Sequence, residues 1–211
     1  MSTELNEVDP ALQKVWPQVT EIEDEFEKIN DTLVKETTIL ATKYENLKAP
    51  IYEKRSEILS QIPKFWSTAF ENHPMLGALL DEEDLLVFEY LTNLKVQRDE
   101  QDCSAYKIAM EFSENPYFEN AALVKEFSHD EDGCCAKVKN HPISWKEGKN
   151  ITTKKDSENE EVDSGSFFMW FTEDDAEIGE LIANDLFPNA LRYFQGIDGE
   201  DSEDEIDAED E

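Results

Sequence analysis

The stretch from Val19 to Leu47, VTEIEDEFEKINDTLVKETTILATKYENL, decides the fold of this chain. Apolar side chains recur in it at intervals of three and four residues, the spacing that places them along one face of an α-helix. The pattern begins before this stretch and continues beyond it, and the apolar positions, interrupted once by Thr37, are Leu12, Val15, Val19, Ile22, Phe26, Ile29, Leu33, Leu40, Tyr44, Leu47 and Ile51. We call these residues the apolar stripe, and they predict a long amphipathic helix.

Prolines set the expected limits of this helix. The dipeptide Asp9-Pro10 is a good helix start, with Asp as the N-cap and Pro at the first helical position. Pro17 is predicted to separate a short first helix from a long second one. Pro50 is predicted to kink the second helix without ending it, because apolar residues continue the same face. The second helix would run from Gln18 to Ile62, about 45 residues or about 68 Å.

The rest of the chain is too small to cover the whole apolar stripe. One interpretation is an amphipathic helix that lies on its own domain. The interpretation we favour is that the stripe pairs with a second copy of the chain, as in two-helix coiled coils. The residues predicted to form this homodimer contact are Val19, Ile22, Phe26, Ile29, Leu33, Leu40 and Leu47.

After Pro63 the pattern changes to short helices and strands. The segments 64–74 and 75–91 are typical of short helices, and a period of two predicts strands at 91–98, 106–112, 122–127 and 143–145. A polar loop is expected at 154–166, then an acidic helix that Asp174 or Asp175 caps and that ends at Asn184. These elements predict an α+β fold: a long helix, then an antiparallel sheet with packed helices. The expected divisions are an N-terminal segment with the long helix (1–62), an α+β domain (63–196) and an acidic tail (197–211).

Composition and charge exclude several classes of protein. The chain has 211 residues with 19 Lys and Arg against 51 Asp and Glu, a formal charge of −32. Such a charge excludes a general nucleic-acid binder that relies on positive charge, and it disfavours anionic membranes. No apolar run approaches the roughly 18 residues of a membrane span, the N-terminus does not resemble a signal peptide, and three cysteines form no disulfide framework. We therefore expect an intracellular, reduced protein.

The negative charge itself indicates a partner. Compact folding against this self-repulsion costs stability, which favours a strongly basic partner such as a histone, a ribosomal protein or a basic nuclear tail. The segment Asp198–Glu211 contains ten acids and no base or aromatic residue, so we predict that it is disordered.

Motifs for catalysis, metals and cofactors are weak or missing. Gly148-Lys149 lacks the preceding glycine of a phosphate-binding loop. The turn 128–133 resembles the start of a calcium loop, but its twelfth position would be Lys139 rather than Glu. His129, Cys134, Cys135 and His141 could form a zinc site only with adjacent cysteines, a poor tetrahedral arrangement. We therefore expect no catalytic residue, no metal and no cofactor, and the protein is predicted not to be an enzyme.

One segment of this acidic chain is rich in lysine. Six lysines and a single acid, Glu147, occupy the 19 positions from Lys137 to Lys155. A loop that balances neighbouring acids would explain this cluster, and a weak contact with DNA phosphates is the alternative. The residues of the possible DNA contact are Lys146, Lys149, Lys154 and Lys155.

Several motifs together resemble the nucleosome assembly protein family, in particular its SET or template-activating factor I branch of histone chaperones. They are KYENLKAPIYEKRSEILSQIPKFWSTAFENHP (43–74), FSENPYFEN (112–120), the box Ile143 with Trp145–Lys149, SFFMWFT (166–172) and LFPNALRYF (186–194) before an acidic tail. The resemblance implies a nuclear, and also cytoplasmic, homodimer with an antiparallel pair of backbone helices. It also implies an "earmuff" domain whose acidic underside binds core histones.

The resemblance, the acidic segment after SFFMWF and the dipole of the expected helix together indicate one histone-binding surface. Its predicted residues are Glu173, Asp174, Asp175, Glu177 and Glu180. The predicted function is that of a histone chaperone, which prevents histone–DNA aggregation and assists nucleosome assembly and disassembly. The alternatives are an acidic regulatory inhibitor of a phosphatase or histone acetyltransferase, and a plain coiled-coil adaptor.

Overall fold

A computed structural model describes residues 10–129, 136–155, 161–163 and 165–196. The tail Asp198–Glu211, predicted above to be disordered, lies outside the described residues. So do Cys134 and Cys135 of the possible zinc ligands.

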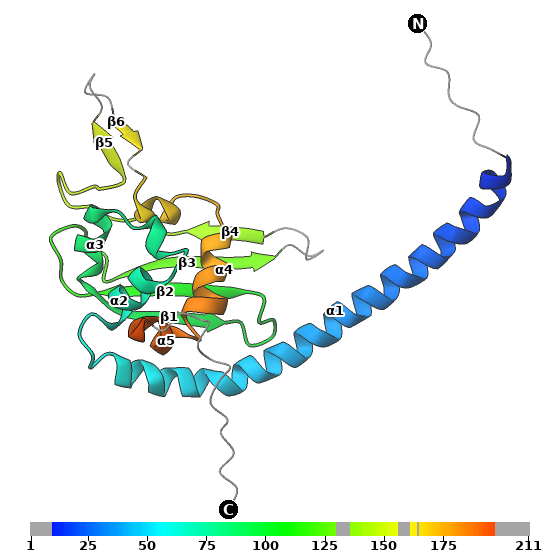
Figure 1. Cartoon of the computed structure of the whole chain (residues 1–211), viewed down its shortest axis with the longest axis horizontal. Helices are drawn as coiled ribbons and strands as arrows, with labels where there is room; N and C mark the ends of the chain where they lie inside the picture. Colours follow the sequence, from blue (N-terminus) through cyan, green and yellow to red (C-terminus); the bar gives the residue numbers. More distant parts are fainter. Residues whose placement is uncertain (1–9, 130–135, 156–160, 164, 197–211) are drawn as a thin grey trace, which may run out of the picture.

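The helix α1 extends without interruption from Pro10 to Leu59, a length of about 75 Å for its 50 residues. The prediction that Pro17 separates two helices is wrong. A proline removes one main-chain hydrogen bond, and on this exposed part of the helix water can solvate the carbonyl that loses its partner. The helix also continues through Pro50, as predicted, and Figure 1 shows it as one curved rod.

Three short helices and a four-stranded sheet follow α1. The helices are α2 (Phe65–Asn72), η1 (Gly77–Leu79) and α3 (Glu82–Phe88). The strands β1 (Leu91–Arg98), β2 (Tyr106–Phe112), β3 (Ala122–His129) and β4 (Ala136–Asn140) pair antiparallel in the order β1-β2-β3-β4. This arrangement confirms the α+β class and three of the four predicted strands.

The fourth predicted strand, 143–145, is wrong. Its only ladder contact is an isolated bridge between Trp145 and Phe118, and β4 occupies the fourth place in the sheet instead. The sequence of β4 hides its strand character because it is an edge strand, with Val138 as its only large apolar residue between Lys137 and Lys139.

The C-terminal part of the chain forms a small hairpin and four helical turns. The hairpin pairs β5 (Thr153–Lys155) with β6 (Glu161–Asp163), so the expectation of a polar loop over 154–166 is wrong there. The two strands of the hairpin pair through main-chain hydrogen bonds, which need no apolar side chains. For this reason the polar sequence gives no sign of the hairpin. The remaining elements are η2 (Phe167–Phe171), α4 (Glu177–Leu181), the π-helical turn η3 (Ile182–Leu186) and α5 (Ala190–Gln195).

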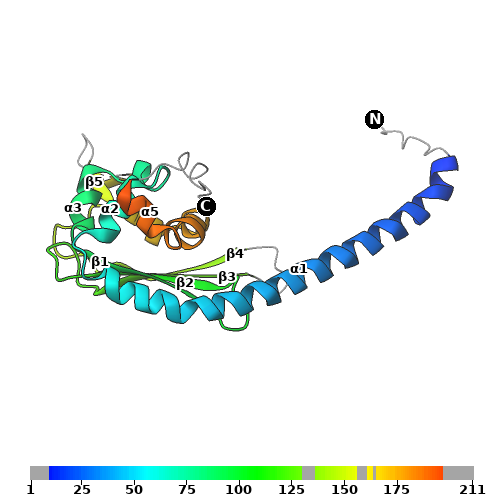
Figure 2. The ribbon, with the colours of Figure 1, turned by 60° about the horizontal axis from the view of Figure 1, so that its bottom comes forward.

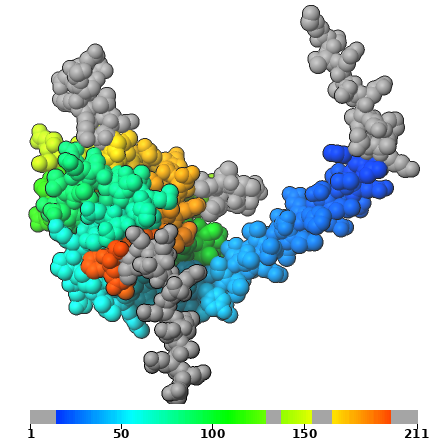
Figure 3. Space-filling view, viewed as in Figure 1, coloured from blue at the N-terminus to red at the C-terminus, as the bar shows by residue number. Residues whose placement is uncertain are grey.

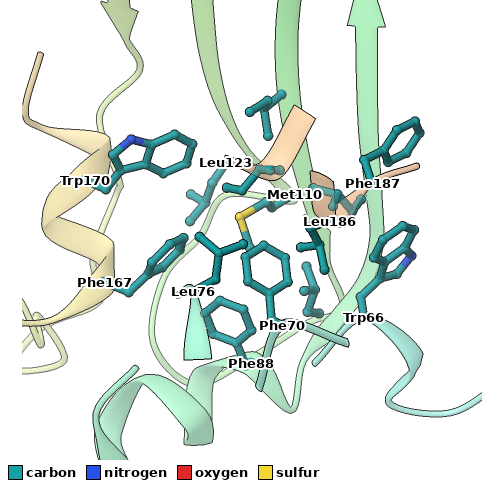
Figure 4. Close-up of a cluster of buried hydrophobic side chains, with 14 of the residues drawn as sticks. Trp66, Phe70, Leu76, Phe88, Met110, Leu123, Phe167, Trp170, Leu186 and Phe187 are labelled. Atoms are coloured by element: carbon teal, nitrogen blue, oxygen red, sulfur yellow. The ribbon is translucent and has the colours of Figure 1, made fainter. Parts of the chain in front are cut away.

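The core lies between the sheet and the helices that cover one of its faces (Figure 2). Along β2 every second residue, from Tyr106 to Phe112, is buried. Phe70 of α2, Phe88 of α3 and Phe167 of η2 lie close together in this layer, and ring contacts connect all three. Figure 4 shows these aromatic rings beside Met110 and Leu123 of the sheet. Four of the five residues of η2 are buried, so this turn is anchored firmly in the core.

The C-terminal third of α1 packs against this domain, and the rest projects away from it (Figures 1 and 3). The guanidinium of Arg55 donates hydrogen bonds to the carbonyl oxygens of Phe187 (2.6 Å) and Pro188 (3.1 Å). Farther along, the Oγ1 of Thr42 accepts a hydrogen bond from the amide of Cys103 at 3.0 Å. Among the described helices, none is long and apolar enough to cross a membrane.

Candidate functional site

Five acids after η2 form the candidate site, on the side of the helical layer that lies nearest β3 and β4. We define Glu173, Asp174 and Asp175 as the acidic turn, and Glu177 and Glu180 continue it on α4. Four of the five side chains are exposed and Asp175 is half-buried. The site therefore presents a group of carboxylates directly to solvent, next to a rigid aromatic core.

Within the described part of the chain, the acids of the site lack cationic partners, a property that they share with acids on the polar side of α1 such as Glu23 and Glu27. Among the described residues, none of the five carboxylates forms an ion pair with Lys, Arg or His. By contrast, Lys64 pairs with Glu89 at 2.6 Å, Lys95 with Glu111 at 2.5 Å, and Lys139 with Glu126 at 3.2 Å. The carboxylates of the site are therefore available to charges from another molecule.

The local structure differs in one respect from the predicted acidic helix. The helix α4 begins at Glu177 with Ala176 in the N-cap position, so the acidic turn precedes the helix and Asp174 and Asp175 are not its N-cap. Asp175 still assists the start of the helix, because its Oδ1 accepts a hydrogen bond from the amide of Glu177 at 2.7 Å. The Oδ1 of Asp174 accepts one from the Nδ2 of Asn140, in β4, at 3.0 Å.

Close packing fixes α4 on the sheet. A Cβ atom added to Gly179 would lie 2.4 Å from the Cζ of Phe127, so only glycine allows this approach of the helix to β3. Tyr106 is buried and stacks on Phe127. Its burial raises the pKa of its hydroxyl, and the negative charge of nearby Glu180 raises this pKa further. The helix therefore carries its two acids at a fixed height above β2 and β3.

The residue that connects the acidic turn to the sheet is Lys125, which the sequence analysis did not identify. Its side chain is fully buried, and its Nζ donates hydrogen bonds to the carbonyl oxygens of Trp170 and Glu173, the latter at 2.8 Å. The signal was present in the sequence, since Lys125 occupies an inward position of a strand between apolar Leu123 and Phe127.

The four lysines of the possible DNA contact are not equivalent. The Nζ of Lys146 donates a hydrogen bond to the carbonyl oxygen of Asn115 at 2.8 Å, so this half-buried side chain supports a turn. Lys149 is exposed and closes the same tight turn through its amide, which bonds to the carbonyl of Lys146 at 3.0 Å. Lys154 and Lys155 lie in β5, and their side chains are outside the described set.

Six of the seven residues of the predicted dimer contact lie on the projecting part of α1, and Leu47 lies where the helix already contacts the domain. All seven side chains are exposed, from 42% for Val19 to 64% for Ile29. Within the described residues no group of three or more His, Cys, Asp or Glu side chains is placed to hold a metal ion.

Comparisons with known proteins agree with this architecture. The sequence profile of the nucleosome assembly protein family matches residues 59–197. The chain is 39% identical to NAP1-related protein 1 of rice (Oryza sativa subsp. indica) over 90% of this chain and 78% of the relative. It is 40% identical to Protein SET of Drosophila melanogaster over 84% of this chain and 71% of the relative. The solved structure of Nucleosome Assembly Protein 1 from Plasmodium knowlesi has the same fold, with a TM-score of 0.68 at 24% identity, covering 93% of this chain and 100% of the other.

Proposed function

Because the chain belongs to the nucleosome assembly protein family, we propose that it is a histone chaperone that binds core histones without catalysis. The histone surface is the acidic turn together with Glu177 and Glu180. The observation that carries this assignment is that five carboxylates, none in an ion pair among the described residues, lie together on a turn and helix start whose main chain Lys125 and Trp170 hold against the core. They can accept charge-assisted hydrogen bonds from histone Arg and Lys, which would otherwise bind DNA indiscriminately. A chaperone of this family would act on chromatin in the nucleus.

A second copy of the chain covers the apolar stripe in this proposal. The stripe is exposed over the part of α1 that projects from the domain, and the family resemblance favours an antiparallel pair of helices. In such a homodimer each chain contributes one acidic surface at either end of a long rod, so that two separated basic regions of a histone assembly can be bound at once.

The test is a titration of core histones with a variant that neutralises four acids, Glu173→Gln, Asp174→Asn, Asp175→Asn and Glu177→Gln. Exposed ion pairs contribute about 0.2–1 kcal/mol each, so the loss of four should raise the histone dissociation constant about tenfold or more. The variant should also fail to prevent histone–DNA aggregation, and the amide side chains keep most of the local hydrogen bonds.

The matched control changes two Glu and two Asp on the polar side of α1, far from the acidic turn: Glu23→Gln, Asp24→Asn, Glu27→Gln and Asp31→Asn. Both variants alter the net charge by the same amount. If both weaken histone binding equally, net charge rather than this surface determines the affinity. If neither does, the histone surface lies elsewhere in the chain.

A further inference from the structure

A single buried ammonium group lies directly beneath the acidic turn. Lys125 projects from β3 into the helical layer, with an exposed fraction of 0%. Burial of a charged group without a paired opposite charge is costly. Within the described residues its Nζ has no carboxylate at ion-pair distance, so the cost is offset by other contacts.

The closest of these contacts involve the segment from Trp170 to Asp175, and the centre of the Phe127 ring lies farther from the Nζ, at 6.0 Å. The Nζ of Lys125 donates to the carbonyl oxygens of Trp170 and Glu173 and lies 4.5 Å from the centre of the Trp170 ring. The Nε1 of Trp170 in turn donates to the carbonyl oxygen of Asp175 at 3.1 Å. Two buried side chains therefore fix three main-chain carbonyls of one short segment. The same segment carries three of the five acids of the site.

We propose that Lys125 is a positioning residue for histone binding, a buried clamp that holds the acidic turn in its binding conformation. The clamp acts on the main chain and occupies neither the carboxylate of Glu173 nor that of Asp174. A free turn of this length would lose conformational entropy on binding, and a turn that is already ordered avoids that loss. This inference rests on the proposed function, because the ordered acids matter only if they contact the partner.

The charge of Lys125 also couples the clamp to binding. Burial lowers the pKa of Lys125 to about 8, against the raising effect of Asp175, Glu173 and Asp174. Its register partners on the neighbouring strands are Ile108 and Asn140, which do not titrate. A basic partner that neutralises the three carboxylates removes their raising effect and lowers this pKa further. Histone binding near pH 8 should therefore release protons from Lys125, and affinity should rise with pH across that range.

The clamp can be tested first in the free protein by hydrogen exchange. In the variant Lys125→Met, which keeps the length of the side chain but removes the donors, the hydrogen-bonded amides of Thr172 and Glu177 should exchange at least about tenfold faster than in the wild type. Amides of β1 and β2 should keep their protection, and Lys125→Arg should restore most of the protection of the turn. Lys107→Met is the matched control, since Lys107 lies on the adjacent strand β2 and points to the opposite face of the sheet. The clamp is refuted if Lys125→Met leaves the turn protected, or if Lys107→Met loosens it equally.

The second test measures binding, and its proton-release part needs no destabilised variant. Wild type and Lys125→Arg are titrated with purified core histones at pH 8, in two buffers that differ in ionisation enthalpy. The wild type should release more protons than Lys125→Arg, because arginine keeps its charge at this pH. Equal release by both proteins would overturn the coupling. Lys125→Met should weaken histone binding about fivefold, with Lys107→Met unchanged.

The two experiments separate the clamp from the function that it serves. Hydrogen exchange is measured without histone and reports only on the turn. If the exchange results are as expected but the four-acid variant binds histones like the wild type, the clamp is real and the proposed histone surface is wrong. If the four-acid variant loses binding while Lys125→Met neither loosens the turn nor weakens binding, the proposed histone surface is supported and the proposed clamp is refuted.

Discussion

Four substitutions in the apolar stripe should convert a dimer into folded monomers. The variant carries Ile22→Glu, Phe26→Glu, Ile29→Glu and Leu33→Glu, at positions where the side chains are 52–64% exposed in the single chain. Glutamate is a good helix former, so the substitutions leave the helical propensity of α1 almost unchanged. They also lie N-terminal to Thr42, where the contacts of α1 with its own domain begin, so the domain should stay folded.

The expected loss of affinity follows from the exposed apolar area. Complete burial of such a side chain contributes about 1.5–3 kcal/mol, so covering the half that is still exposed should contribute about 1 kcal/mol. Across both copies the four substitutions remove about eight such contributions, or about 8 kcal/mol, before any cost of burying carboxylates. Since about 1.4 kcal/mol corresponds to a factor of ten, the dimer should weaken by a factor of about 10⁵ or more. A dimer with a nanomolar dissociation constant would then be monomeric at micromolar concentration.

Sedimentation velocity at micromolar concentration measures the outcome, and circular dichroism reports whether the domain is folded. The matched control is Lys28→Glu with Lys35→Glu, two exposed positions on the opposite side of α1 that alter the net charge by the same −4. The control should remain dimeric. The reasoning is refuted if the wild type is a folded monomer at this concentration, or if the variant with four glutamate substitutions sediments as a dimer. Equal dissociation of the control would show that charge repulsion, not loss of apolar contact, separates the chains.

Three further predictions test the domain and its lysines. Asp84→Ala removes the N3 half of the capping box of α3 and the acceptor of the buried Phe167 amide, so the free energy of unfolding in urea should fall by about 2–4 kcal/mol. Gly179→Ala forces a methyl group against Phe127 and should cost about 1–3 kcal/mol in the same measurement; an unchanged midpoint would contradict the packing of α4. The third variant replaces four lysines by alanine: Lys146, Lys149, Lys154 and Lys155. It should bind a labelled DNA duplex more weakly in a fluorescence anisotropy assay, while its histone binding stays nearly constant. Equal loss of both activities would contradict a separate DNA contact.

The long helix and most of the sheet were predictable because their patterns are strong and local. The apolar stripe repeats over many turns, and the alternation from Tyr106 to Phe112 places every second residue in the core. The errors occurred where structure depends on pairing with distant residues. Nothing in the sequence around Val138 shows that β4 completes the sheet, because an edge strand that bears lysines has too few apolar residues to show a period of two. The effect of Pro17 was overestimated, because one missing hydrogen bond on an exposed helix is easily replaced by water.

The acids of the candidate site were predictable as a cluster, but their arrangement was not. Sequence spacing predicted a helix from Asp174 onward, whereas the chain makes a turn there and begins α4 at Glu177. The difference comes from contacts that no local pattern encodes. The carbonyl of Glu173 is bound by Lys125, which lies 48 positions away in the chain, and the carbonyl of Asp175 is bound by the indole of Trp170.

Net charge alone does not locate a binding surface in a chain with 51 acids and 19 bases; the clustering of acids on an anchored segment is the more specific feature. Several lysines lie beside carboxylates such as Glu45, Glu89 and Glu111, whose negative charge they offset locally. At the acidic turn, Lys125 lies beneath the surface and binds main-chain carbonyls instead. The carboxylates there keep their charge toward solvent, while the buried ammonium reduces the repulsion among them. A basic partner therefore meets a cluster of unpaired carboxylates on a turn whose main chain is already held in place, which is a combination that favours tight binding to a polycation.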